Sequence, residues 1–220
     1  MRHFELHFSR PLQRAVFLFG VACILAVNSY SQKASAKDDQ FTKLLAKVQA
    51  GDTSIDFKSL RLASVDSKSD AAGEVDPVSR QKLLGAYKAG KFDETIAFGE
   101  QVLDGAYVNL EVHLLVGAAY RERGNQKKFE FHRAVYLGLL NSIMEGADGK
   151  SAKTAYVVIG VYEEYAVLRA LDLVLKSQTV HDEGGHKYDL LSANDPKTKA
   201  TRDVWFNIDI VWAGYNKIFK

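Results

Sequence analysis

The chain has 220 residues, of which 47% are hydrophobic, enough for a packed core in one domain or in two small ones. Three prolines and 16 glycines exclude collagen-like and proline-rich proteins, and a single cysteine excludes both an internal disulfide framework and a zinc site built from several cysteines. The formal net charge is +2, a mildly basic balance of the kind that nucleic-acid-binding proteins often show.

Residues 1–36 are predicted to be an export signal. Arg2, Arg10 and Arg14 precede an apolar run at residues 15–27. The run is shorter than the roughly 20 residues of a membrane-spanning helix and has the length of a secretory signal. Small residues allow cleavage after Ser31 or after Ala36, and the sequence does not choose between them.

Two other interpretations of this segment stay open. It could remain as an uncleaved N-terminal anchor, or Cys23 could be the lipidated residue of a lipoprotein. Lipidation is disfavoured, because Gly20 stands where such signals favour leucine and the apolar run continues past Cys23.

Cleavage would change the charge. Residues 37–220 contain 25 basic and 26 acidic residues, a net charge of −1, and no cysteine. The basic excess therefore belongs to the export signal, and no nucleic-acid partner is expected. We expect a periplasmic or secreted protein that has no membrane span after signal cleavage and is held together by its core alone.

Residues 37–75 are predicted to form an N-terminal helix and an arm. Apolar residues at Phe41, Leu44, Leu45 and Val48 share one face of a helix that ends near Gly51. The spacing at residues 54–62 fits neither a helix nor a strand, so this segment is predicted to be an arm packed on the body. Residues 65–74 are polar and predict a loop.

Residues 76–145 are predicted to form two helical hairpins. Asp76 and Pro77 are typical of a helix start. The predicted helices span residues 77–89, 92–104, 109–123 and 126–144.

The two hairpins resemble tetratricopeptide repeats. Similar turns at residues 90–93 and 124–127 lie 34 residues apart, which is the period of that repeat. Gly117 and Tyr120 match the repeat's spacing, whereas Tyr87 follows Gly85 one residue too early. An ordinary helical bundle with a chance period is the alternative. Two repeats are fewer than the three a solenoid needs, so the flanking regions are expected to cover its ends.

Residues 146–220 are predicted to form a small C-terminal α+β region. A helix is expected at residues 163–175, with Tyr165, Leu168, Leu171 and Leu175 facing inward. The predicted strands span residues 154–160, 187–192 and 204–212, with a weaker one at 177–181. The predicted fold class is therefore α+β: tetratricopeptide-like helical hairpins followed by a small, mostly antiparallel sheet.

The motifs predict no cofactor and leave the catalytic residues unknown. Gly149–Ser151 resembles the end of a phosphate-binding loop, but Met144 stands where that motif requires glycine and no strand precedes it. There is no nucleophile elbow, and no cysteine remains after cleavage. No metal site is predicted. His181, His186 and Asp189 are the weak candidates, because a polar turn explains the same residues.

Other polar residues have a structural interpretation beside a functional one. His132 could be a base, but a histidine on an apolar helix side more often satisfies a core contact. Glu163 and Glu164 could be an acid–base pair, but acids at a helix start are expected from the helix dipole, and adjacent residues point apart. Asn207 and Asp209 could form a ligand rim beside Trp205 or a solvated strand face.

Several segments are similar to a bacterial family of secreted proteins known as domain of unknown function 4919. They are residues 51–57, 131–132, 148–151, 156–159, 163–168, 185–189, 195–198 and 206–209. The resemblance covers about residues 40–212. It implies an exported protein with tetratricopeptide-like helices, and it implies no activity.

The expected function is non-catalytic protein interaction in the cell envelope, with an unidentified protein partner. The reasons are the helical-repeat groove and the absence of a catalytic constellation from the sequence. The alternative is an uncharacterised hydrolase, or a protein that binds a small ligand or a metal through the C-terminal sheet, with His181, His186 and Asp189 as its site.

Overall fold

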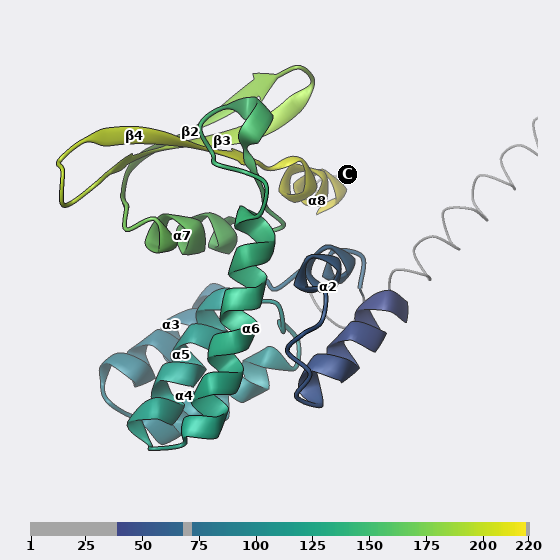
Figure 1. Cartoon of the computed structure of the whole chain (residues 1–220), viewed down its shortest axis with the longest axis vertical. Helices are drawn as coiled ribbons and strands as arrows, with labels where there is room; N and C mark the ends of the chain where they lie inside the picture. The colour runs from purple at the N-terminus through teal and green to yellow at the C-terminus, as the bar shows by residue number, and fades with distance from the viewer. Residues whose placement is uncertain (1–38, 68–71, 219–220) are drawn as a thin grey trace, which may run out of the picture.

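The computed structural model describes residues 39–67 and 72–218 (Figure 1). The predicted export signal, both cleavage positions and Cys23 lie outside the described residues. Within the described ranges, no helix is long and apolar enough to cross a membrane.

Four of the helices form two successive hairpins, as predicted. They are α3 (Pro77–Lys88), α4 (Phe92–Leu103), α5 (Leu110–Glu122) and α6 (Gln126–Met144). The side chain of Asp76 caps α3, and Asn109 and Asn125 cap α5 and α6 in the same way. Gly90 and Gly124 have φ angles of 70° and 74° and follow the ends of α3 and α5. The repeated turn glycines therefore serve the same purpose in both hairpins.

The N-terminal region covers one side of α6. Residues 39–49 are helical, and Phe41 and Val48 are buried as predicted. The predicted irregular arm is wrong, because α2 (Phe57–Ser64) is a helix capped by Asp56. The Phe57 ring occupies the space where a side chain at Gly138 of α6 would lie. This close approach explains the glycine in the middle of α6.

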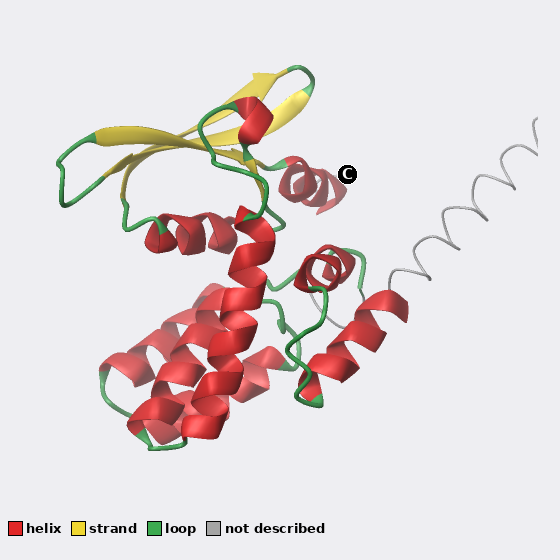
Figure 2. Ribbon diagram, viewed as in Figure 1, coloured by secondary structure: helices red, strands yellow, loops and turns green. Residues whose placement is uncertain are grey.

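The C-terminal region contains a four-stranded sheet in the order β1–β4–β3–β2 (Figure 2). Its strands are β1 (Tyr156–Val157), β2 (Val174–Glu183), β3 (His186–Asn194) and β4 (Thr201–Asn207). Strands β2, β3 and β4 pair antiparallel, and β1 pairs parallel to β4. The helix α7 (Val161–Ala170) lies between the sheet and the hairpins in Figure 1. The chain is thus α+β, with one core cluster that runs from the hairpins into the sheet.

Three predicted elements of the C-terminal region have different bounds in the structure. The strand expected at residues 154–160 is reduced to the two residues of β1, after a short 3₁₀ turn at Ala152–Thr154. The helix expected at 163–175 ends at Ala170, Tyr165 is 42% exposed, and Leu175 belongs to β2. The ten residues of β2 pair along β3, which extends this strand well beyond the predicted 177–181.

The last predicted strand, at 204–212, ends early. Strand β4 stops at Asn207, and residues Asp209–Ile218 form the helix α8. The side chain of Asn207 accepts a hydrogen bond from the backbone N–H of Asp209, which caps the turn into the helix. The alternation of apolar residues continues past the end of β4, but the apolar residues after Ile208 belong to α8.

Candidate functional site: a groove on the helical hairpins

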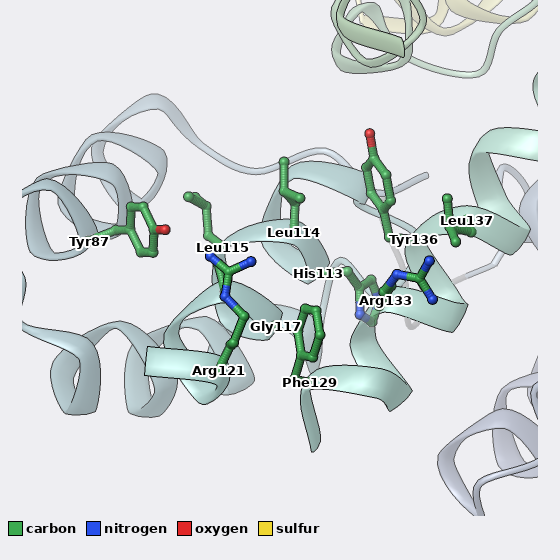
Figure 3. Close-up of a pocket in the computed structure, with 11 residues that line it drawn as sticks. Tyr87, His113, Leu114, Leu115, Gly117, Arg121, Phe129, Arg133, Tyr136 and Leu137 are labelled. Atoms are coloured by element: carbon green, nitrogen blue, oxygen red, sulfur yellow. The ribbon is translucent and has the colours of Figure 1, made fainter. Parts of the chain in front are cut away.

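An apolar groove of about 460 Å³ lies on the helical hairpins (Figure 3). Its floor and walls come from α5 and α6, with Tyr87 of α3 at one end. The half-buried residues Leu114, Ala118, Phe129 and Tyr136 give it an aliphatic and aromatic surface. Such a surface suits an apolar ligand or the apolar side of a protein segment.

The spacing of the lining residues follows from the two helices. Leu114, Ala118 and Arg121 on α5 are separated by four and three residues, and so are Phe129, Arg133 and Tyr136 on α6. Each set therefore forms one stripe along its helix. The stripes face the groove together because α5 and α6 pack closely.

The groove carries positive charge. Arg121 and Arg133 line it, and none of the described residues that line it is acidic (Figure 3). Each arginine side chain is 56% exposed and forms an ion pair with a glutamate on its own helix, Arg121 with Glu122 at 3.3 Å and Arg133 with Glu130 at 3.5 Å. Exposed pairs of this kind are weak, so both guanidinium groups remain open to a ligand.

A buried polar chain lies behind the groove and links α4, α5 and α6. His113 and His132 are buried, and their Nδ1 atoms lie 3.1 Å apart. His113 Nε2 is 2.7 Å from the carbonyl oxygen of Tyr107. His132 Nε2 is 3.4 Å from a carboxylate oxygen of Glu100, which accepts a hydrogen bond from the hydroxyl of Tyr120 at 2.9 Å.

The partners of these histidines determine where the protons are. A carbonyl only accepts, so Nε2 of His113 donates and its Nδ1 accepts from His132. Burial, with His132 nearby, lowers the pKa of His113 to about 3 and keeps it neutral. Contact with His132, aided by the Tyr120 hydroxyl, lowers the pKa of Glu100 to about 2.

The two histidines therefore have a structural role: they connect α5 to α6 inside the protein. Both nitrogens of His113 are occupied within the protein, so neither is available to a substrate in the groove. Gly117 lies between the helices, and a Cβ there would approach the Cβ of His132 to 3.1 Å. The prediction that His132 is a core residue is confirmed, although its Nε2 makes no hydrogen bond among the described residues.

A second buried polar cluster joins the helices to the sheet region. Arg61 of α2 is 1% exposed and donates to Glu163 of α7 at 2.8 Å, to the carbonyl of Val157 at 3.1 Å and to Ser142 of α6 at 3.1 Å. Burial raises the pKa of Glu163 to about 7, although the Arg61 charge opposes the shift. The cluster is a structural junction without solvent access.

Glu164 forms a carboxyl pair with Asp189. Both are buried, and no donor side chain among the described residues reaches either oxygen of Glu164 or Oδ1 of Asp189. The other oxygen of Asp189 accepts a hydrogen bond from Gln178 at 2.6 Å. Burial, followed by repulsion from Asp189, raises the pKa of Glu164 to about 9. Glu164 is therefore protonated at neutral pH. The helix dipole therefore does not account for Glu163 and Glu164, because both are buried.

The structure does not bring the weak metal candidates together. His181 and His186 are exposed on the β2–β3 hairpin, whereas Asp189 is buried against Glu164. His186 Nδ1 lies 2.6 Å from a carboxylate oxygen of Asp209. No group of three histidine, cysteine, aspartate or glutamate residues suited to a metal ion occurs in the described ranges.

The expected ligand rim at the end of the sheet is largely satisfied internally. Asp209 accepts hydrogen bonds from the amide of Asn207 at 3.2 Å and from the backbone N–H of Lys187 at 2.8 Å. Trp205 lies beside Tyr188 and His181. These contacts hold the start of α8 against the sheet, so Asn207 and Asp209 have a structural role.

The sequence predicted a helical-repeat groove, but not its position between α5 and α6 or the residues that line it, and it did not predict the roles of Arg61 and His113. The stripes on α5 and α6 carry the only sequence signal for the groove, and helix periodicity alone does not separate a groove from a packed face.

Comparison with known proteins identifies the family of this chain. The family described as Domain of unknown function (DUF4919) matches residues 30–217, which is most of the chain. The chain belongs to this family. No curated protein matches it. No solved structure matches it either. Membership in this family assigns no activity.

Proposed function

We propose that this is an exported protein of the cell envelope and a non-catalytic protein-interaction module that binds its partner in the groove of α5 and α6. Export is supported by the arginines and the apolar run of residues 1–36. The observation that carries the interaction role is the groove itself, an apolar and aromatic surface whose neighbouring histidines are both engaged within the protein.

Fewer observations support the alternative, a ligand or metal site on the C-terminal sheet. His181 and His186 are separated from Asp189, which is buried against Glu164. The contact between His186 and Asp209 is exposed and lies at the start of α8.

Site-specific photo-crosslinking in cells tests the proposal. A photoreactive phenylalanine replaces Leu114 in the groove or, as the control, Lys127, which is exposed at the start of α6 outside it. The protein captured at Leu114 is identified and purified, and its affinity is measured for the wild type, Ala118→Trp and Lys127→Trp.

We expect capture at Leu114 and a loss of affinity of at least tenfold in Ala118→Trp, because the indole fills the groove. Lys127→Trp should bind like the wild type. Tyr136→Ala, which removes a wall without filling the groove, serves as a second variant if Ala118→Trp does not fold. Equal capture at both positions, or unchanged binding by both folded groove variants, would overturn the proposal.

A further inference from the structure

The groove has the construction of a surface against which a helix packs. Side chains on packed helices form ridges of residues three or four positions apart. The two stripes have this spacing: Leu114, Ala118 and Arg121 on α5, and Phe129, Arg133 and Tyr136 on α6. In the interior of a helical stack, a further helix would cover such a pair of stripes. Here α5 and α6 end the run of hairpins, and the apolar side chains between the stripes are half-buried.

The charged side chains that line the groove are both arginines. Arg121 and Arg133 lie on the two stripes, one from each helix, and no described residue that lines the groove is acidic (Figure 3). The Arg121 guanidinium also lies 5.6 Å from the centre of the Phe129 ring, which places the charge beside the aromatic surface. A ligand that matches this surface carries carboxylates beside an apolar face.

We infer that the groove binds an amphipathic helix of a partner protein, whose apolar face fills the space between α5 and α6 and whose aspartates or glutamates pair with Arg121 and Arg133. This inference rests on the proposed function and adds the chemistry of the partner. Recognition of an amphipathic helix through anchors at such spacings is an established mode of protein binding.

A selection from a peptide library tests this chemistry. The probes are helical peptides of about 18 residues with leucines fixed at helical spacing on one face and flanking positions that vary among Glu, Gln and Lys. They are selected against the purified protein. We expect enrichment of Glu at the flanking positions for the wild type, and of Lys for the double variant Arg121→Glu, Arg133→Glu.

The affinity of a selected acidic peptide should fall about threefold in Arg121→Gln or Arg133→Gln, and about tenfold in the double variant. The loss should shrink at high ionic strength, because both arginines are exposed. Arg123→Gln is the matched control: Arg123 lies at the end of α5, pairs with Asp93 at 2.8 Å and does not line the groove. It should leave the affinity unchanged.

The possible failures separate the two proposals. If peptides bind, Ala118→Trp blocks them, and Glu is not enriched, this inference is overturned and the proposed function survives. If no peptide is selected, or Ala118→Trp binds the selected peptides normally, the proposed function fails with it. A dimer in light scattering that Ala118→Trp converts to a monomer would assign the groove to a second copy of the chain and would also overturn the inference.

Discussion

The buried carboxyl pair predicts that Glu164→Gln stabilises the protein. The folded state holds a proton on Glu164, whose pKa is raised from 4.5 to about 9 by burial and by Asp189. A raised carboxyl pKa contributes stability that is fully present below pH 4.5 and is lost as the pH rises toward the folded value. At pH 7 the unfolded chain has released this proton and the folded chain has not.

The size of the effect follows from the difference between pH 7 and 4.5. At about 1.4 kcal/mol per pH unit, retaining the proton costs about 3 kcal/mol at neutral pH. The amide of a glutamine keeps the shape, donates to the free oxygen of Asp189 and does not titrate. We therefore expect Glu164→Gln to gain up to about 3 kcal/mol at pH 7, more at pH 9 and almost nothing at pH 4.

Urea denaturation at pH 4, 7 and 9 measures the difference in unfolding free energy between the variant and the wild type. The m-values of the two proteins should be equal, which shows that the substitution leaves the denatured state unchanged. The matched control is Glu163→Gln on the neighbouring residue, which removes the carboxylate from Arg61 and should destabilise by about 3–5 kcal/mol at pH 7. A Glu164→Gln variant that is no more stable than the wild type at pH 7 and pH 9 would refute the raised pKa of Glu164.

Three further predictions concern other parts of the chain. Glu100→Gln should destabilise by about 1 kcal/mol at pH 7, a value reduced for partial exposure. Because the pKa of Glu100 is lowered, the difference should disappear as the pH falls toward 2, and denaturation curves over this range check it. Gly138→Ala should cost about 1–3 kcal/mol in urea denaturation because its methyl group meets the Phe57 ring, whereas Gly85→Ala, in open space on α3, should gain about 0.5–1 kcal/mol. Mass spectrometry of the protein from envelope or medium should find Gln32 or Lys37 as the first residue, and an intact Met1 would argue against cleavage.

The helical hairpins could be predicted because their signals are local. Asp76, Asn109 and Asn125 cap helices within three residues of themselves, and Gly90 and Gly124 stop them. The predicted bounds of α3 to α6 therefore differ from the observed ones by at most one residue at either end. The hairpin between β2 and β3 was also visible in the sequence, although the length of β2 depends on its pairing with β3.

The polar interior could not be predicted in this way. Glu163 and Glu164 stand at a helix start, where local rules place acids in solvent, and their partners Arg61 and Asp189 are distant in the sequence. His113 and His132 meet only because α5 and α6 pack at Gly117. The groove depends on the same packing, since each stripe alone has the periodicity of an ordinary core face.

Binding at the groove tests the central claim most directly. The affinity of the partner captured at Leu114 is measured by titration against the wild type, Ala118→Trp and Lys127→Trp, after thermal unfolding shows that all three are folded. We predict at least a tenfold weaker complex for Ala118→Trp alone, because its indole occupies the space between α5 and α6. Equal affinity for all three proteins would show that the groove of the hairpins is not the binding site.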